Sequence, residues 1–185
     1  MNSINVLKTL VIFAPGVKYD INKPLLKMFY DYFDADKVVF KYDFDQFDDS
    51  KIEEQYTKII SELKTIDFKP YNEIIFVGKS LGSYFLGKAR TELGLKLAKF
   101  ICLTPLDITI PFLYQTDYIL YGTNDQYLSI EARNSLKYKY VNLSIVDNAN
   151  HSLKIEGQSE EDFDKLLKRI KLEALTYLEA SSYME

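Results

Sequence analysis

One serine of this chain stands in a setting that favours chemical reactivity. Ser80 lies in a G-x-S-x-G pattern, with Gly78 and Gly82 each two positions away. The apolar run before it, residues 73–77, is short, β-branched and aromatic, which predicts a buried strand. The residues after it have helical spacing up to Gly94, a typical helix cap. The pattern therefore predicts a tight strand-to-helix turn, a nucleophile elbow, whose glycines avoid collisions and whose serine hydroxyl is exposed.

The single histidine of the chain is the natural partner for this serine. A serine hydroxyl is a poor nucleophile at neutral pH and needs a base to take its proton. Histidine suits this role because its unperturbed pKa lies close to neutrality. His151 follows the alternating run 141–146, which predicts a strand with one polar face. We therefore expect His151 to be the general base for Ser80.

An acidic residue must in turn orient the imidazole and stabilise its charged form. Asp125 is the first candidate, because it lies in the turn that leaves the expected strand 118–121. Asp125 also suits a simple turn, since Asn-Asp favours turns, and Asp107, one strand earlier, is the alternative acid. With Asp125 the chain order is Ser80, Asp125, His151, the order found on the α/β-hydrolase scaffold.

The sequence resembles a small, lidless α/β-hydrolase over nearly its whole length. Three stretches carry the resemblance, namely residues 76–82, 121–125 and 148–152. The resemblance implies an α/β fold with a mainly parallel six-stranded sheet, helices on both faces and a single domain over residues 1–185. Larger members of the family insert a lid after the fourth strand. This chain has only residues 104–117 at that place, too few for a lid domain.

A weaker part of the resemblance concerns the loop after the first expected strand. Members of the family usually have His-Gly there, and backbone N–H groups of this loop help to form the oxyanion hole. This chain has Pro15 and Gly16, so the glycine matches and a proline replaces the histidine. The resemblance implies that the N–H groups of Val17 and Leu81 would hold the developing oxyanion.

The resemblance also implies a function. We expect a serine hydrolase that cleaves a small ester or thioester through an acyl-enzyme on Ser80, with a small-molecule acyl substrate and no cofactor. The alternative is a ligand-binding or sensor protein on the same fold, with weak or no turnover. We expect a substrate pocket beside Gly16, Ile110 and Phe112. The two apolar side chains equally suit a cover over the end of the sheet.

Three other features have plain structural explanations. Lys79 in the elbow is expected to be solvated, with a bias of substrate charge as the alternative. Cys102 lies in an apolar run and is expected to behave as a small buried hydrophobe. The acidic stretch 43–49 lacks a ligand and a glycine that a calcium loop needs, so we expect a solvated loop and no metal site.

Strand and helix patterns alternate along the chain, which predicts parallel strands with helices on both faces of the sheet. The expected strands are residues 9–14, 38–42, 73–77, 99–103, 118–121 and 141–146. Helices are expected at 23–33, with Pro24 in the first turn, and after Ser50, which forms a capping box with Glu53. Ser159 is expected to cap a last helix.

The composition suits a compact enzyme in a reducing compartment. Of the 185 residues 47% are hydrophobic, which is enough for one large core. The lone cysteine rules out an internal disulfide and predicts a cytoplasmic location. A net charge of −4 argues against a nucleic-acid partner, and the apolar run 10–14 is too short for a signal sequence or a membrane span. The sequence leaves the oligomeric state open.

Overall fold

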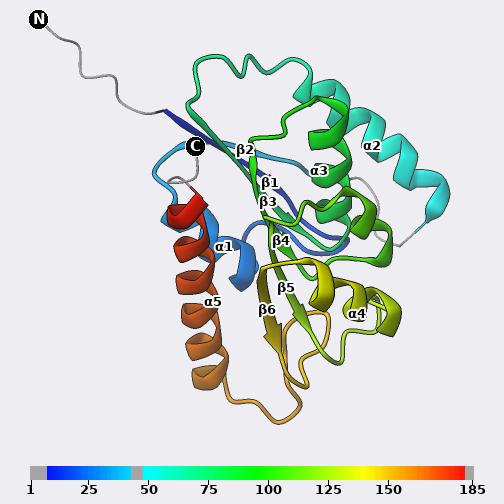
Figure 1. Cartoon of the computed structure of the whole chain (residues 1–185), viewed down its shortest axis with the longest axis vertical. Coiled ribbons are helices and arrows are strands. Elements are labelled where there is room, and N and C mark those ends of the chain that lie inside the picture. Colours follow the sequence, from blue (N-terminus) through cyan, green and yellow to red (C-terminus); the bar gives the residue numbers. More distant parts are fainter. Residues whose placement is uncertain (1–7, 43–47, 182–185) are drawn as a thin grey trace, which may run out of the picture.

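A six-stranded parallel β-sheet lies at the centre of the part of the chain that the structure describes. The computed structural model describes residues 8–42 and 48–181. The strands are β1 (Thr9–Ala14), β2 (Asp36–Val39), β3 (Glu73–Lys79), β4 (Lys99–Leu103), β5 (Tyr118–Gly122) and β6 (Asn142–Val146). They lie in the order β2-β1-β3-β4-β5-β6, and every neighbouring pair is parallel (Figure 1). The predicted fold class is confirmed.

Helices cover both faces of this sheet (Figure 1). The helices α1 (Pro24–Tyr32) and α5 (Glu160–Ser181) pack on one face, and α2 (Asp49–Leu63), α3 (Leu81–Glu92) and α4 (Ile130–Lys139) pack on the other. Each face has its own hydrophobic cluster, to which the strands contribute alternate side chains. Burial on both sides explains why β1, β4 and β5 are nearly continuous apolar runs and why their positions could be predicted.

Local sequence signals set the starts of three helices. Pro24 occupies the first turn of α1, as predicted. Ser159 accepts a hydrogen bond from the N–H of Asp162 at 3.1 Å and so caps α5, also as predicted. The predicted start of α2 is wrong by two residues, because Asp48 is its cap and accepts from the N–H of Ser50 at 3.0 Å.

Two elements differ from the sequence-based expectation. β2 spans residues 36–39 instead of 38–42, because this edge strand begins to pair with β1 at Asp36, opposite Leu10. A polar residue on an edge strand gives no hydrophobic signal. No helix was expected at α4, where Ala132 and Leu136 alone are buried, too narrow an apolar face to recognise in the sequence.

The connection between β4 and β5 holds one short 3₁₀ helix, η1 (Asp107–Phe112), and no lid domain. A buried ion pair fixes this connection. Both guanidinium ends of Arg90 on α3 reach the carboxylate of Asp117, at 2.7 and 2.6 Å. Arg90 also donates to the carbonyl oxygen of Phe112 at 3.3 Å. Since removal of either partner would leave a buried charge unpaired, the segment is held against α3.

The direction of the chain reverses between β1 and β3. From β1 the chain moves outward to β2 through α1 on one face, and from β3 it moves the other way through α3 on the opposite face. Ala14 at the end of β1 pairs with Gly78 near the end of β3. Open α/β sheets bind their ligands at the carboxyl ends of the strands at such a reversal. Both Gly16 and Ser80 follow these two strand ends.

Helix α3 approaches β1 so closely that the contact excludes a side chain. A Cβ atom on Gly82, in the first turn of α3, would overlap the carbonyl oxygen of Ala14. The obstacle is backbone on both sides, so no rotation of a side chain can relieve it. Gly82 therefore fixes how α3, and with it the turn at Ser80, sits on the sheet.

We expect Gly82→Ala to lower the free energy of unfolding by ~3 kcal/mol or more, because the backbones of α3 and β1 must separate. Gly157→Ala is the matched control: Gly157 has a φ of +75° and open space around its Cβ position, so only backbone strain of ~1 kcal/mol is expected. Chemical denaturation of both variants measures the difference. Equal losses would contradict the close approach at Gly82.

Candidate active site

Ser80 lies in the predicted elbow between β3 and α3. Its backbone has a φ of 55° and a ψ of −122°, a conformation that residues with a side chain rarely adopt. The N–H of Ser80 donates to the carbonyl oxygen of Leu103 at 2.9 Å, which ties the turn to β4. A Cβ on Gly78 would lie 2.6 Å from the Cα of Ser83, so this glycine is required by the same turn. The two glycines thus have the roles that the sequence predicted for them.

Three side chains form a continuous line of hydrogen bonds. The Nε2 atom of His151 lies 2.8 Å from the Oγ atom of Ser80. The Nδ1 atom of the same ring lies 2.7 Å from the Oδ2 atom of Asp125. A carboxylate beside Nδ1 accepts a hydrogen bond from the Nδ1–H group, and this leaves Nε2 free to accept the serine hydroxyl proton. The residues come from loops after β3, β5 and β6, and the fold brings together all three that the sequence singled out.

The Asp125 carboxylate is buried and held from two sides. Asp125 is 1% exposed, and its second carboxylate oxygen, Oδ1, accepts a hydrogen bond from the N–H of Tyr127 at 2.9 Å. The alternative acid, Asp107, is exposed and accepts instead from the N–H of Ser129 at 2.8 Å, at the start of α4. Of the two aspartates that the sequence left open, the structure therefore joins Asp125 to His151.

The loops that carry Asp125 and His151 are joined through their backbones. A Cβ on Gly122 would overlap the carbonyl oxygen of Ala149, and that same oxygen accepts from the N–H of Asn124 at 3.0 Å. The N–H of Asn148 donates to the hydroxyl of Thr123 at 2.7 Å. These contacts set the distance between the carboxylate and the imidazole before any side chain is considered.

Burial dominates the electrostatics of His151. It lowers the pKa of the imidazole below the ordinary value of 6.5, because the charged form loses its hydration. The hydrogen bond to Asp125 acts in the opposite direction, and the positive charge of Lys79 lowers the pKa further. The ring of Tyr127 stands edge-on to the imidazole, with 4.8 Å between the centroids. The imidazole of His151 is therefore neutral at neutral pH and able to accept a proton.

Two backbone N–H groups beside Ser80 are available as donors. Leu81 is the first residue of α3, where a helix leaves its N–H groups without intrahelical acceptors. Val17 follows Gly16, whose Cβ position would lie 3.0 Å from the Cβ of Ser80. Among the backbone hydrogen bonds of turns, loops and helix caps in the described part of the chain, none is donated by the N–H of Val17 or Leu81. The loop after β1 thus lies directly against the serine.

The expectation of a solvated Lys79 is wrong. Its residue is 4% exposed, and its Nζ atom lies 4.9 Å from the centre of the Tyr19 ring. Burial lowers the pKa of its amine to about 8, and the carboxylate of Asp125 partly opposes this shift. Strand β3 continues through Lys79, so its side chain shares a face of the sheet with the buried Val77. The alternation of a buried strand is the signal that identifies this position in the sequence.

Two of the expected pocket residues lie on η1. Ile110 and Phe112 are half-buried. The ring of Phe112 meets that of Tyr84 on α3 at 5.7 Å between centroids, and its Cβ lies 3.1 Å from the Cβ position of Gly87. Both expected roles, pocket wall and cover over the sheet, are compatible with this position.

The residues with a strained backbone in the described part of the chain lie at the carboxyl end of the sheet. The residues with a side chain and a φ between 44° and 60° are Lys18, Ser80, Thr104, Asn148 and Leu153. They lie in the loops that follow β1, β3, β4 and β6, at the carboxyl ends of the strands. Each such residue costs ~1–3 kcal/mol, and strain of this kind is typically kept at functional sites.

The other observations set limits on the chemistry. Cys102 is fully buried and burial raises the pKa of its thiol, as expected of a structural cysteine. Residues 43–47 of the acidic stretch lie outside the described residues. Among those described, no group of three or more His, Cys, Asp or Glu side chains is arranged to hold a metal ion. Within the same ranges no helix is both long and apolar enough to cross a membrane.

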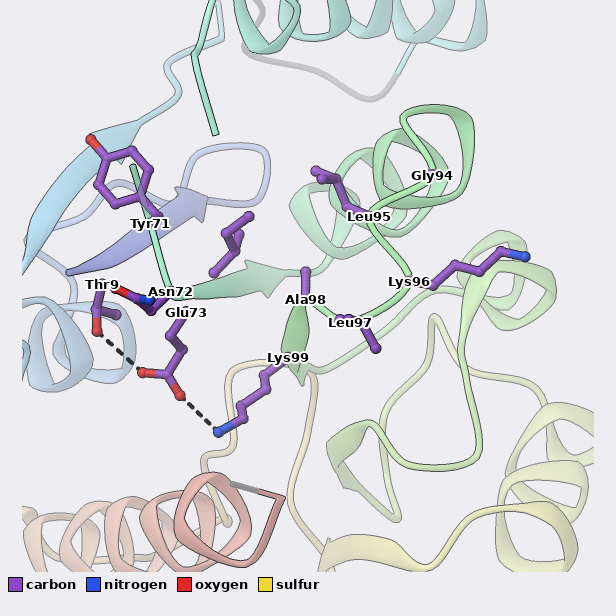
Figure 2. A pocket seen from close by; sticks show the side chains of 11 residues that line it. Thr9, Tyr71, Asn72, Glu73, Gly94, Leu95, Lys96, Leu97, Ala98 and Lys99 are labelled. Atoms are coloured by element: carbon purple, nitrogen blue, oxygen red, sulfur yellow. Dashed lines mark hydrogen bonds and ion pairs between the residues drawn. The ribbon is translucent and has the colours of Figure 1, made fainter. Parts of the chain in front are cut away.

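Figure 2 shows a hollow of about 530 Å³. It lies at the opposite end of the sheet from Ser80, because Ser80 follows the carboxyl end of β3. Residues at the starts of β1, β3 and β4 line it, among them Thr9, Glu73 and Lys99. The carboxylate of Glu73 accepts from Lys99 at 2.7 Å and from the hydroxyl of Thr9 at 3.2 Å. Thr9, Glu73 and Lys99 are thus engaged with one another, and we assign no chemistry to this hollow.

Known structures share the fold of this chain. The chain is similar to an α/β serine hydrolase homologue from Coxiella burnetii, with 15% identity over 91% of this chain and 84% of that one and a TM-score of 0.64. A serine hydrolase without a lid from Xanthomonas campestris has 13% identity, coverage of 96% and 85%, and a TM-score of 0.61. The mouse α/β hydrolase domain-containing protein 10 has 12% identity, coverage of 88% of each chain and a TM-score of 0.59.

These likenesses define the fold. The chain has the α/β-hydrolase fold in a small form without a lid domain between β4 and β5. No protein-family model matches the sequence, and no curated protein matches it significantly.

The strain at Ser80 predicts an unusual effect on stability. We expect Ser80→Gly to be more stable than Ser80→Ala by roughly 1 kcal/mol, because glycine adopts a φ of 55° without a steric cost. Ser152 is exposed and has no positive φ, so there Gly should be less stable than Ala by roughly 0.5–1 kcal/mol. Urea denaturation of the four variants tests this. The same order of stability at both positions would contradict the strained elbow.

Proposed function

We propose that this protein is a serine hydrolase that cleaves a small ester or thioester through an acyl-enzyme on Ser80. The observation that carries the proposal is the line of hydrogen bonds from Ser80 through His151 to Asp125, at 2.8 and 2.7 Å. The α/β-hydrolase fold, with the serine in a strained elbow, supports it. A cytoplasmic location and a single domain over residues 1–185 remain predictions from the sequence.

In the proposed reaction Ser80 attacks the acyl carbonyl carbon while His151 takes the hydroxyl proton at Nε2. His151 then gives this proton to the leaving group, and the acyl group stays on the serine oxygen. A water molecule activated by His151 attacks the acyl-enzyme in the second half of the reaction, and the acid leaves. Asp125 holds the imidazole in the required tautomer and stabilises its charged form.

The developing oxyanion needs donors that are already in place. We assign this role to the N–H groups of Val17 and Leu81. Val17 follows Gly16, whose Cβ position lies 3.0 Å from the Cβ of Ser80, and Leu81 follows Ser80 at the start of α3. A preorganised donor of this kind is worth ~3–4 kcal/mol of the barrier. Because backbone groups would do this work, Pro15 in place of the family's histidine removes no donor.

The substrate is proposed to be small because the connection between β4 and β5 holds no lid domain. Gly16 would border it on one side, and Ile110 and Phe112 on η1 would line the acyl group on the other. Both apolar side chains are half-buried and belong to the connection that leaves the carboxyl end of β4, where α/β sheets bind ligands. Thioesterase, acyltransferase and peptidase reactions use the same three residues, so substrate screening distinguishes them.

The first test is removal of the three side chains. We expect Ser80→Ala and His151→Ala each to lower ester turnover by roughly 10⁴-fold or more, and Asp125→Asn by roughly 10²–10⁴-fold. Asp107→Asn is the matched control, because Asp107 contacts the start of α4 and not His151. Turnover of short p-nitrophenyl esters is the readout, with circular dichroism to confirm folding.

Covalent labelling by a fluorophosphonate probe completes this test, because only an activated serine reacts. Labelling that is lost in Ser80→Ala and retained in Asp107→Asn supports the hydrolase. A wild-type protein that is folded but not labelled would favour a binding or sensor protein and contradict the proposal. A large loss for Asp107→Asn with little change for Asp125→Asn would move the acid to Asp107.

The state of His151 predicts how activity depends on pH. Neutral imidazole is the base, so kcat/KM is lost as the pH falls through the pKa of His151. Since burial lowers that pKa, we expect the loss to occur at a pH below the ordinary value of 6.5. A profile of kcat/KM from pH 4.5 to pH 8 for an uncharged ester measures it. An apparent pKa above 6.5 would mean that the Asp125 hydrogen bond outweighs burial.

A final test concerns the proposed acyl wall. Phe112→Ala should shift the preference among p-nitrophenyl esters toward longer acyl chains. Each methylene that enters the space left by the ring should gain roughly 1 kcal/mol of binding free energy. The ring is half-buried against Tyr84, so some loss of stability is expected as well. An unchanged chain-length profile together with a lower melting temperature would assign Phe112 to the core.

A further inference from the structure

Lys79 differs from the other buried cations of the described residues. Those are Arg90 and Lys99, and each has a carboxylate partner, Asp117 at 2.6 Å and Glu73 at 2.7 Å. Lys79 is 4% exposed, yet no carboxylate in the described part of the chain lies within 4.0 Å of its Nζ atom. Its recorded neighbour at the ammonium is the face of the Tyr19 ring, at 4.9 Å.

The position of this ammonium ties it to the candidate active site. Lys79 directly precedes Ser80, and its Cδ atom lies 3.3 Å from the Cβ position of Gly16, in the loop that carries Val17. Its charge acts on both Asp125 and His151. The carboxylate whose charge acts on Lys79, that of Asp125, already accepts hydrogen bonds from two other groups.

A hollow of about 510 Å³ opens beside the same loop. Gly16, whose Cβ position lies close to the Lys79 side chain, and Tyr19, whose ring faces the ammonium, both line it. Lys18 and Lys41 also line this hollow, against the carboxylate of Asp20. The Asp20 carboxylate accepts from the N–H of Asn22 at 2.7 Å. The described lining of this hollow therefore holds two lysines and one aspartate.

A buried ammonium without a counter-ion is costly, and a methionine of similar length would fill the same space without that cost. Burial lowers the pKa of Lys79 only to about 8, so the amine keeps its charge at neutral pH. A fixed positive charge beside the serine is complementary to a negative charge on the substrate. Charged groups of the protein that lack a partner gain one when such a ligand binds.

We propose that Lys79 is a specificity-determining residue that makes this site prefer substrates bearing a carboxylate. This proposal rests on the hydrolase function proposed above and names the class of its substrate. The carboxylate can belong to the acyl part or to the leaving group, and the experiment separates these two sources.

The experiment compares esters that differ in one charge. For the acyl part, the p-nitrophenyl monoester of glutaric acid is compared with its neutral amide isostere, p-nitrophenyl glutaramate. For the leaving group, the acetate ester of 4-hydroxybenzoate is compared with that of 4-hydroxybenzamide. At pH 7.5, where the Lys79 amine is still mainly charged, kcat/KM is measured for the wild type and for Lys79→Met. We expect at least a tenfold preference for the charged ester in one of the pairs, lost in Lys79→Met.

The control is Lys154→Met, which removes a charge from an exposed lysine three residues after His151. It should retain the preference and change kcat/KM for each of the esters by less than about threefold. No preference in either pair, or a preference that Lys79→Met retains, would overturn the proposal. An equal loss on charged and neutral esters would also overturn it, because Lys79 would then act on the reaction and not on the choice of substrate.

A binding measurement separates the failure of this proposal from the failure of the hydrolase function. Calorimetry with free glutarate and free 4-hydroxybenzoate requires no turnover. If the fluorophosphonate probe labels nothing but one of these anions binds the wild type at least tenfold more tightly than Lys79→Met, the hydrolase function fails and the carboxylate site stands. Equal binding by both proteins refutes the site. Lys79→Gln replaces Lys79→Met if the latter does not fold.

Discussion

The contact between the backbones of α3 and β1 is the constraint on which this site depends. Because Gly82 lies against the carbonyl oxygen of Ala14, the first turn of α3 has one possible position on the sheet. Ser80 stands two residues before that glycine, so backbone packing fixes the turn that presents its hydroxyl to His151. Gly122 against Ala149 has the same effect on the loops of the acid and the base. The line of hydrogen bonds results from two close backbone approaches at one edge of the sheet.

The backbone strain at the carboxyl end of the sheet is balanced by the burial of the strands that lead to it. Residues such as Ser80 and Leu153 keep positive φ angles only because the strands before them are fixed. β1, β3 and β4 carry nearly continuous buried runs and pair along most of their lengths. The free energy gained by hydrophobic burial in the middle of the sheet thus offsets the backbone strain at its carboxyl end. This division between a buried middle and a strained carboxyl end explains why the G-x-S-x-G pattern directly follows an apolar strand in the sequence.

The same division determines what the sequence could predict. A strand that is buried on both faces consists of a run of apolar residues, so β1 and β4 were predicted at their observed bounds. The predicted bounds of the edge strand β2 differ from the observed ones. The G-x-S-x-G pattern and the single histidine identified two members of the candidate site. The choice between Asp125 and Asp107 depends on distances between loops, which no local pattern contains. Lys79 was misjudged because its motif was considered without the alternation of the strand that it ends.

Three ionisable groups, Asp125, His151 and Lys79, give the site its electrostatic character. At neutral pH the carboxylate and the ammonium carry opposite charges, and burial keeps the imidazole neutral. In the proposed reaction His151 becomes positive as an oxyanion forms, so the step separates charge without changing the total. The charge of Lys79 opposes the imidazolium but favours the oxyanion, and the two effects partly cancel. A fixed cation at this position therefore costs little in the chemical step, and its main effect falls on which substrates bind.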